Sequence, residues 1–553
     1  MENLSQEKRK RMIAFLKKIK EEHKDDDETL IALDEIENEL NSKKYGLVWE
    51  KHEEKVDRMM QDNIPVFTEV KEREIKATYE NSYNFLLEGD NLHSLKLLEK
   101  THAGKIDVIY IDPPYNTRNK DFIYDDTFVD KNDGYAHSKW LSFMSERLEI
   151  AKRVLSDEGV IFISINRYEH AQLKILCDTI FGEENLLGII TWESTTQPIN
   201  AGIAKFQIQQ KCEFIYIYAK NKSKKNNFKL KETLTKNSYP HKGKYGKCRF
   251  EIIEKSDSGQ YKRDSMKFRI LGHYPREGKR WQIGVETARK LEAEGKLEIV
   301  NGIVKKAIYP EDETEKVTLQ PFWSHLDSKL VGTAQKGKDE LNFVMSKSVG
   351  FDTVKPTDLI INLLSHFENN ITILDFFAGS GTTAHAVLEL NKEDGGNRKF
   401  ILCTNNENNI CEEITYERIK RVIYGYSYVE KKKNVEKTVN VEGIPANLKY
   451  FKTDFIPKDA DDVSEELLAH IKEMVELENG INIDNKHYLI ILTDEQADEL
   501  AKNWSNYEDV KAIYVSRNVL FTSEQNTLFR NTEIHTIPDY YFEYELKELG
   551  ESW

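Results

Sequence analysis

The sequence predicts an α/β protein with a mostly parallel sheet, interrupted by an inserted module. Short apolar runs rich in β-branched residues alternate with segments of helical spacing, first over 81–219 and again over 355–404. Such runs are typical of strands buried on both faces, and their alternation with helices is typical of parallel sheets. Residues 221–350 lose this periodicity, which predicts a separate module between the two stretches.

The apolar runs and helical spacings locate the expected elements. The first stretch predicts strands at 85–90, 106–111, 160–165, 188–192 and 214–219, and helices at 92–98, 138–155 and 169–181. A polar loop rich in Asp and aromatic residues follows the second of these strands, over 116–132. The second stretch begins at 355–360 and predicts strands at 371–375 and 399–404, with a helix at 384–390.

Composition divides the chain into five predicted regions. Residues 1–60 are highly charged with apolar residues at helical spacing, which predicts amphipathic helices. Residues 61–220 and 351–429 are the two parts of the α/β domain, and 221–350 are the insertion, where we expect irregular β structure. Residues 430–553 are acidic and contain an expected strand at 488–493, so we predict a C-terminal α/β region.

Length and composition restrict the class of protein. A chain of 553 residues is too long for one core and fits several domains. No apolar run approaches the roughly 18 residues of a membrane span, and the charged N-terminus lacks the apolar region of a secretory signal. We therefore expect a cytoplasmic protein with no membrane partner. Five cysteines without C-x-x-C spacing predict free thiols, and no residue cluster has the spacing of metal ligands.

The charge is distributed unevenly. The net charge is −15, yet residues 205–290 contain 23 Lys and Arg against 8 Asp and Glu. Aromatic residues are interleaved with these cations, namely Tyr239, Tyr245, Phe250, Tyr261, Phe268, Tyr274 and Trp281. A solvated charged face is one interpretation. A binding site for a polyanion is the other, since a basic block between acidic regions is the electrostatic pattern of nucleic-acid binding.

The segment Asp112-Pro113-Pro114-Tyr115 directly follows the expected strand at 106–111. Two prolines cannot continue a central strand, so the segment is a rigid loop at the carboxyl end of the strand, where open α/β sheets bind ligands. A rigid turn without function is the alternative. The residues suit methylation of an exocyclic amine, because a carboxylate and a fixed carbonyl can accept its N–H groups. The Tyr115 ring can stack on a base that has left the duplex.

A glycine loop, Phe377-Ala378-Gly379-Ser380-Gly381, connects the strand at 371–375 to the next helix. Its two glycines permit a tight turn and a close approach of the backbone to a nucleotide cofactor at a helix N-terminus. The pattern also fits G-x-G-x-x-A, so an NAD site competes with other nucleotide cofactors. Asp375 before the loop, and Asn405 or Glu407 after the next strand, could bind ribose hydroxyls.

A third glycine pattern, from Gly332 to Asp339, differs by one residue from a P-loop. Asp339 stands where Ser or Thr would bind magnesium, and no buried strand precedes the glycines. We therefore expect no ATP site here.

The two motifs together resemble the amino-group DNA methyltransferases that use S-adenosylmethionine. The catalytic loop precedes the cofactor loop, with a large insertion between them, which is similar to the permuted beta group of adenine-N6 and cytosine-N4 enzymes. The chain most resembles the modification subunits of type III restriction–modification systems. That resemblance rests on 86–91, 108–116, Lys355-Pro356 and 375–383.

The resemblance implies a Rossmann-like methyltransferase sheet with permuted motif order, in which 221–350 is a target-recognition domain. It implies that Asp112, Pro113, Pro114 and Tyr115 contact the flipped target base, and Asp112 in place of Ser favours adenine. The implied cofactor residues are Asp90, Lys355, Pro356, Asp375, Phe377, Ala378, Gly379, Gly381, Thr382 and Thr383, with Asn405 or Glu407 for the ribose. The implied partners are double-stranded DNA, a second copy in a homodimer, and a restriction subunit.

Three other functions remain open from the sequence. A cytosine-N4 methyltransferase would use the same two motifs. A nicotinamide-dependent oxidoreductase would use the glycine loop, and a non-catalytic DNA-binding subunit would need only the basic insertion. The identity of the modified base, the cofactor that binds and the transfer of a methyl group distinguish these alternatives.

Overall fold

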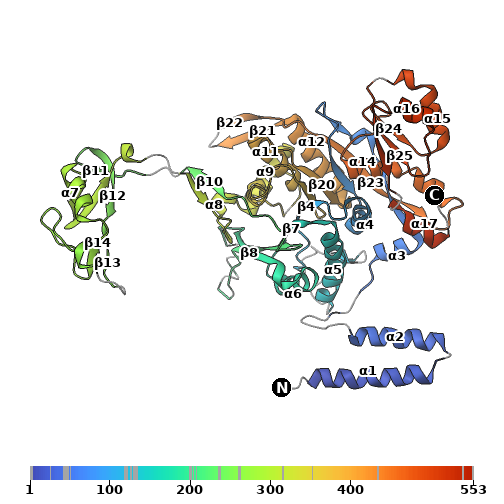
Figure 1. Ribbon diagram of the computed structural model, residues 1–553, viewed down its shortest axis with the longest axis horizontal. Helices are drawn as coiled ribbons and strands as arrows, with labels where there is room; N and C mark the ends of the chain where they lie inside the picture. The colour runs from blue at the N-terminus through green and yellow to red at the C-terminus, as the bar shows by residue number, and fades with distance from the viewer. Residues whose placement is uncertain are drawn as a thin grey trace. The chain divides into compact units, whose positions relative to one another are not determined.

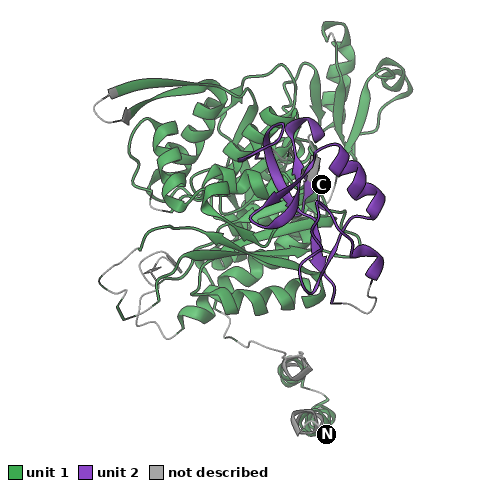
Figure 2. Ribbon diagram, turned by 90° about the vertical axis from the view of Figure 1, so that its left-hand side faces the viewer, with its two compact units in different colours: residues 1–227, 323–553 green, residues 228–322 purple. Residues whose placement is uncertain are grey.

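The computed structural model describes residues 4–24, 26–41, 49, 52–117, 123–124, 127–128, 135–198, 202, 205–206, 208–234, 238–258, 263–313, 317–351, 353–432, 435–507, 509–538 and 541–550. Most of the loop predicted at 116–132, and Tyr261, lie outside these residues. The chain divides into two compact units (Figure 2). Residues 1–227 and 323–553 form the first unit, and residues 228–322 form the second.

An 11-stranded mixed sheet is the centre of the first unit (Figure 1). Its strands follow the order β1-β23-β3-β20-β19-β4-β7-β9-β8-β18, and β2 pairs with β23. Their bounds are β1 (Asn63–Glu69), β2 (Ile75–Lys76), β3 (Tyr83–Glu88), β4 (Ile106–Ile111), β7 (Leu155–Ile165), β8 (Leu186–Glu193), β9 (Cys212–Ala219), β18 (His325–Leu326), β19 (Thr372–Asp375), β20 (Lys399–Thr404) and β23 (Asn447–Pro457). The α/β class that the sequence predicts is confirmed.

Strand direction determines which residues meet. The strands from β23 to β7 in this order all run parallel, so their carboxyl ends lie along one edge of the sheet. Strand β9 is antiparallel to both of its neighbours, β7 and β8. The first residues of β9 therefore lie at the same edge as the last residues of β4, β7 and β8.

Helices cover both faces of this sheet. On one face α4 (Asn91–His102), α5 (Ala136–Val154) and α6 (His170–Phe181) pack against Ile161, Ile163 and other buried strand residues. Phe162, which lies between them in β7, points to the opposite face and contacts Phe367 with ring centroids 5.8 Å apart. Phe367 follows α10 (Thr357–Leu364), which packs beside α11 (Thr382–Asp394), and α11 contacts α12 (Glu417–Tyr424).

The C-terminal segment is more closely joined to the central sheet than the predicted region 430–553 implies. Strand β23 pairs with β3 and β1, because its apolar residues Tyr450 and Phe451 are buried in the sheet. The helices α13 (Val463–Leu468), α14 (Ile471–Asn479) and α17 (Glu543–Leu549) contribute to the same core. A separate, smaller parallel sheet consists of β24 (Tyr488–Ile491), β25 (Ala512–Ser516) and β26 (Glu533–Ile537). Helix α15 (Asp494–Lys502) contacts β24 and α16 (Ser523–Leu528).

The second unit has its own core. Its four-stranded sheet has the order β11-β12-β16-β15, and all its neighbours are antiparallel. The bounds in this unit are β10 (Lys231–Leu234), β11 (His241–Gly243), β12 (Gly246–Ile252), β13 (Glu254–Ser256), β14 (Lys279–Trp281), α7 (Val285–Ala293), β15 (Leu297–Val300), β16 (Ile303–Ile308) and β17 (Val317–Gln320). This unit is narrower than the predicted insertion 221–350, because β18 and α9 (Ala334–Met345) belong to the first unit.

The remaining helices and strands belong to none of the sheets described so far. They are the N-terminal helices α1 (Leu4–Glu22), α2 (Asp27–Asn41) and α3 (Lys55–Asp62), the short helix α8 (Ser328–Val331), the hairpin β21 (Gly425–Lys432) with β22 (Val435–Glu442), and the short pair β5 (Ile123–Tyr124) with β6 (Thr127–Phe128). Within the part of the chain that the structure describes, none of the helices combines the length and apolar composition of a bilayer-spanning segment.

Candidate active site

Four parallel strands end side by side at the carboxyl edge of the central sheet. Strand β3 leads to Asp90, β20 to Asn405, β19 to the glycine loop and β4 to Asp112. Because β9 is antiparallel, Glu213 near its start lies at this edge as well, close to Trp192 at the end of β8. The fold thus brings both sequence motifs to one edge.

The loop after β4 is held rigidly by its neighbours. The indole Nε1 of Trp140, in α5, donates a 2.7 Å hydrogen bond to the Pro114 carbonyl. Asn116 adopts a left-handed conformation with φ +53°, and its Nδ2 donates to the Ala136 carbonyl at 3.1 Å and to Glu169 at 2.6 Å. In the described residues the Pro113 carbonyl accepts no hydrogen bond, so it remains available to a ligand.

Two side chains of this loop, Asp112 and Tyr115, form a polar group with Glu213 and Lys355. The Tyr115 hydroxyl lies 2.8 Å from Asp112 Oδ1 and 3.0 Å from Glu213 Oε2. Lys355 Nζ donates to Asp112 Oδ2 at 2.6 Å and to the Tyr115 hydroxyl at 2.7 Å, and lies 3.6 Å from Glu213 Oε2. The same ammonium lies 4.9 Å from the Tyr115 ring centroid and 5.7 Å from that of Trp192. Lys355, which the resemblance groups with the cofactor residues, thus has its side chain at the loop after β4.

Burial and charge shift the pKa values of this group. Burial raises the pKa of Tyr115 well above its usual range, and the Asp112 and Glu213 carboxylates raise it further, so the phenol stays neutral. Burial disfavours the Lys355 cation, but Asp112 and Glu213 outweigh this effect and the pKa of Lys355 is raised. Lys355 is therefore a permanent cation between two carboxylates.

Close packing fixes the Lys355 backbone. A Cβ atom added to Gly337 of α9 would meet the Val354 carbonyl oxygen at 2.4 Å and the Pro356 nitrogen at 2.8 Å, so only glycine permits this approach. The Thr382 hydroxyl, at the start of α11, donates to the Lys355 carbonyl at 3.3 Å. Gly337, one of the glycines of the P-loop-like pattern, thus serves packing.

The glycine loop between β19 and α11 is braced from within. Gly379 and Gly381 have φ angles of +49° and +75°, which glycine adopts without strain. Asp375, 2% exposed, accepts hydrogen bonds from the Phe377 N–H at 3.0 Å and from the Thr383 hydroxyl. Burial raises the pKa of Asp375 to about 7. Its carboxylate shapes the loop, and both of its oxygens are used inside the protein.

Arg418 of α12 ties this loop to its surroundings. Its fully buried guanidinium donates to the Ser380 carbonyl at 3.3 Å, the Thr382 hydroxyl at 2.8 Å and the Thr357 hydroxyl at 3.3 Å. Burial lowers the pKa of Arg418 to about 10. Because one side chain spans the glycine loop and α10, it holds the two in a fixed relation.

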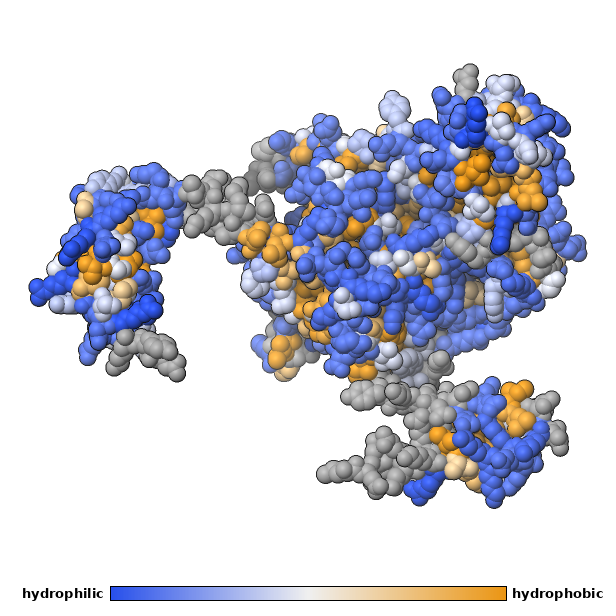
Figure 3. Space-filling model, viewed as in Figure 1, coloured by the Kyte–Doolittle hydropathy of each residue, from blue (hydrophilic) through white to orange (hydrophobic). Residues whose placement is uncertain are grey.

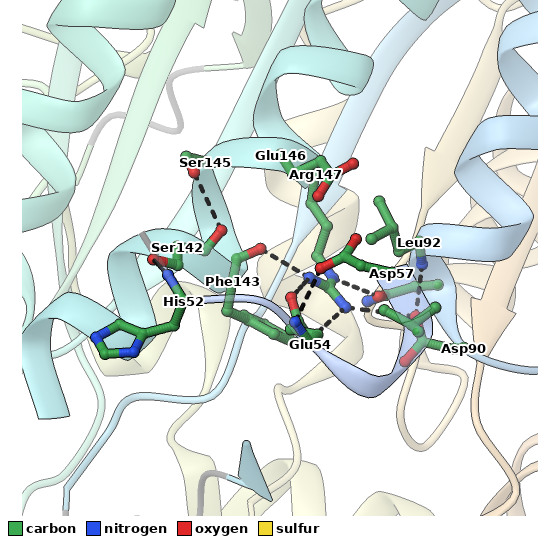
Figure 4. A network of polar contacts seen from close by, with 12 residues as sticks. His52, Glu54, Asp57, Asp90, Leu92, Ser142, Phe143, Ser145, Glu146 and Arg147 are labelled. Carbon is green, nitrogen blue, oxygen red and sulfur yellow. Dashed lines mark hydrogen bonds and ion pairs between the residues drawn. The ribbon is translucent and has the colours of Figure 1, made fainter. Parts of the chain in front are cut away.

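A second buried arginine organises the end of β3 (Figure 4). Arg147 of α5 donates to Asn91 Oδ1 at 2.6 Å and to Asp90 Oδ1 at 3.3 Å, and it binds both carboxylate oxygens of Glu54 at 2.7 and 3.2 Å. Asn91 in turn donates to the Phe376 carbonyl at 2.8 Å. Asp90 also accepts from the Leu92 N–H at 2.8 Å and caps α4, while its side chain stays 42% exposed.

The predicted site residues fall into three groups. The first group consists of the loop after β4 and the glycine loop, which follow the neighbouring strands β4 and β19. The Ala378 N–H of the glycine loop donates a hydrogen bond to the Cys403 carbonyl of β20 at 3.1 Å. Asn405 and Glu407 lie exposed after β20, and Pro356 is a buried cap of α10. Sequence reasoning missed Glu213, Trp192, Arg147 and Arg418. Their only signal was a polar or aromatic residue at the end of an apolar run, or a charged residue inside a helix.

No metal site accompanies this arrangement in the described residues, where no three His, Cys, Asp or Glu side chains are grouped to hold an ion. The edge therefore offers hydrogen bonds, an aromatic face and fixed charges.

Known proteins are similar to this chain in sequence. The model of a DNA methylase family of N6 and N4 methyltransferases matches residues 106–418. The chain is 33% identical to the type III restriction-modification enzyme StyLTI Mod subunit of Salmonella typhimurium, over 63% of this chain and 58% of that subunit. It is 33% identical to the type II methyltransferase M.KpnI of Klebsiella pneumoniae, over 58% of this chain and 79% of that enzyme. It is 26% identical to the type III EcoP15I Mod subunit of Escherichia coli, over 85% of this chain and 79% of that subunit.

Proposed function

Because the chain belongs to this DNA methylase family, we propose that it transfers a methyl group from S-adenosylmethionine to the N6 amine of a flipped-out adenine in double-stranded DNA. The family resemblance based on the two motifs is thereby confirmed. One observation carries the proposal. The fold places Asp112-Pro113-Pro114-Tyr115 and the glycine loop at adjacent strand ends, so an amine and a cofactor can be held next to each other.

The residues at this edge fit the proposed cofactor. Within the described residues the Gly379 and Ser380 N–H groups have no protein acceptor, and the N-terminus of α11 begins immediately afterwards, which suits a carboxylate. Asp90, Asn405 and Glu407 offer exposed acceptors for an amine and for ribose hydroxyls. S-adenosylmethionine, when bound, supplies an electrophilic methyl group.

The catalytic loop provides the acceptor side of the reaction. Asp112 and the free Pro113 carbonyl can each accept an N–H of the target amine, which makes its nitrogen lone pair more available. The Pro114 carbonyl is less suited to this role, because it already accepts a hydrogen bond from Trp140. The ring of Tyr115 offers a face for stacking, a contact worth about 1–3 kcal/mol per base. These groups are preorganised by the rigid loop.

A methyl-transfer assay with mapping of the modified base tests the proposal. The purified protein, unmethylated genomic DNA and tritiated S-adenosylmethionine should yield labelled DNA that contains N6-methyladenine. N4-methylcytosine in the product would establish the alternative activity, and absence of label would leave a DNA-binding subunit. Calorimetry with S-adenosylhomocysteine and with NAD separates both from an oxidoreductase.

The second unit is proposed to recognise the target sequence. Residues 228–322 contain 21 Lys and Arg against 14 Asp and Glu. Of its aromatic residues, Trp281 is buried in the unit's core and Phe268 packs against it, so these two serve folding. Tyr245 and Tyr274 are exposed and lie next to Lys244 and Arg269, each cation 5.3 Å from the ring centroid. These two pairs are the better candidates for contact with DNA.

Removal of this unit should abolish site-specific methylation without unfolding the first unit. The two ends of the insertion are already adjacent, since Lys231 pairs with Gln320, so a short Gly-Ser linker can replace 231–320. We expect the shortened protein to bind S-adenosylhomocysteine as the full chain does. Sequencing of methylated DNA should then find no modified motif. The same motif at undiminished frequency would exclude the unit as the reader.

Assembly with other chains is proposed as well. The names of two of the relatives suggest that the chain is a modification subunit that associates with a restriction subunit. A DNA substrate also fits the cytoplasmic location expected from the sequence. The resemblance implies a homodimer, and α1 and α2 offer a surface for it. Leu16 and Leu33 are buried there, whereas Phe15 and Ile31 are 63% and 62% exposed. Figure 3 shows hydrophobic atoms at the surface of this helical pair.

Charge favours a second copy as the partner of this helical pair. Helix α1 has seven basic and three acidic residues, and α2 has six acidic and none basic. A twofold contact can therefore place α1 of each copy against α2 of the other. Light scattering should give twice the 64.6 kDa mass of one chain, and Phe15→Glu with Ile31→Glu should give a single chain. The exposed His23→Glu is the control, and a double variant that remains dimeric would exclude this surface.

A further inference from the structure

We propose that, before DNA binds, the Lys355 ammonium occupies the hydrogen-bonding position on Asp112 that the target amine takes later, and that Glu213 receives Lys355 when the base enters. This inference rests on the proposed function, because it concerns how the Asp112 carboxylate becomes available to an exocyclic amine.

Both oxygens of Asp112 are already engaged. Oδ1 faces the Tyr115 hydroxyl at 2.8 Å, and Oδ2 accepts from Lys355 Nζ at 2.6 Å. An exocyclic amine is also an N–H donor, and it approaches a carboxylate whose two oxygens each already accept a hydrogen bond. A charged donor binds a carboxylate more strongly than a neutral one. Lys355 therefore needs a second partner if a neutral amine is to replace it.

Glu213 is placed to be that partner. Its Oε2 lies 3.6 Å from Lys355 Nζ and 3.0 Å from the Tyr115 hydroxyl. Closing this distance to a hydrogen bond of about 2.8 Å requires only a small movement of the lysine side chain. The Tyr115 hydroxyl lies within hydrogen-bonding distance of both carboxylates, so it can likewise change its acceptor from Asp112 to Glu213. The group thus has two arrangements, one with Lys355 on Asp112 and one with Lys355 on Glu213.

The surroundings guide this movement. Trp192 and Tyr115 flank the ammonium, at 5.7 and 4.9 Å, so it stays near an aromatic face in either arrangement. The Lys355 backbone is held by Gly337 and Thr382 and does not need to move. Lys355 is 8% exposed, which keeps water from substituting for either carboxylate.

The charges explain why a lysine is present at all. Asp112 faces Glu213 from β9 and the buried Asp375 from β19, along with the neutral phenols of Tyr110 and Tyr115. Among the described residues, Lys355 is the only cation that forms an ion pair with Asp112. Without it, the Asp112 and Glu213 carboxylates would be two like charges close together with no cation between them, which is electrostatically unfavourable. Lys355 is therefore a positioning residue that compensates this charge until the amine arrives.

Four proteins test the proposal: the unchanged chain, Glu213→Gln, Lys355→Met and the double variant. Single-turnover transfer from tritiated S-adenosylmethionine to unmethylated genomic DNA is measured from pH 6 to pH 9. At pH 7.5 we expect Glu213→Gln to be at least about tenfold slower, because Lys355 loses its charged second partner. Lys355→Met should also be slower than the unchanged chain, because Asp112 and Glu213 then lack the cation between them. The double variant should be faster than either single variant.

The controls separate this mechanism from a loss of structure. All four proteins should bind S-adenosylhomocysteine equally and melt within a few degrees of one another. Glu193→Gln, at the end of β8 with its own partner Lys211, should keep its rate within about twofold. A double variant no faster than Glu213→Gln, or a Lys355→Met variant as fast as the unchanged chain, would overturn the proposal. If the unchanged chain itself transfers no methyl group to DNA, the proposed function fails instead.

Discussion

Replacement of Asp112 by alanine is expected to reduce methyl transfer to DNA by at least about a hundredfold, the cost of losing one preorganised polar group in an active site. In the proposed reaction the carboxylate accepts the amine hydrogen bond that prepares the nitrogen for attack, and no other carboxylate in the described residues lies in this loop. Asp112 does not contact the glycine loop, so the affinity for S-adenosylhomocysteine should change by less than about threefold. Single-turnover transfer and calorimetry measure the two quantities.

The Asp112→Asn variant distinguishes the effect of the side chain's charge from the effect of its shape. Asp112→Asn keeps an acceptor oxygen but removes the charge that Lys355 binds, so we expect an intermediate rate and little loss of thermal stability. The matched control is Asp339→Ala, an exposed carboxylate on α9 whose partner is Gln335. An Asp112→Ala variant with a transfer rate near that of the unchanged chain would refute the assigned role of the carboxylate.

The sequence was most informative where local pattern decides structure. The strand expected at 106–111 has the bounds Ile106–Ile111 in β4, because a run of six residues with four β-branched side chains favours a strand buried on both faces. The prolines that follow specify a rigid loop. The glycine loop is equally local, since its conformation depends on positive φ angles at Gly379 and Gly381.

The target side of the site depends on long-range topology and was not predictable from one sequence. Lys355 bonds to Asp112 across 243 residues. Glu213 reaches the site only because β9 is inserted antiparallel between β7 and β8, a choice that no local pattern in 212–219 reveals. Similarly, the pairing of β23 with β3 joins the acidic C-terminal segment to the central sheet, whereas charge alone suggested a separate region.

Arg147 is another residue whose role depends on contacts between distant segments of the chain. In the sequence it is one of several charged residues in an amphipathic helix, yet it is fully buried and connects three segments of the chain (Figure 4). Its guanidinium carbon lies 3.7 Å from the Phe143 ring centroid, and Phe143 contacts Phe377 of the glycine loop at 5.8 Å. Glu54, from the segment before α3, therefore reaches the cofactor side of the site through this one side chain.

Arg147→Met should lower the free energy of unfolding by about 3–5 kcal/mol, because it leaves the Glu54 carboxylate buried without its cation. Burial already raises the pKa of Glu54, and Arg147 opposes that shift. In the variant the pKa of Glu54 rises further, so the protonated form stabilises the fold at low pH, and the stability deficit should be smaller at pH 5 than at pH 8.

Adding Glu54→Gln to Arg147→Met should restore part of the loss at pH 8. Arg153→Met, on the same helix but half exposed and paired with Glu99, should cost less than about 1 kcal/mol. Denaturant titrations at the two pH values measure these differences, and a deficit independent of pH would show that the Glu54 charge is not its cause.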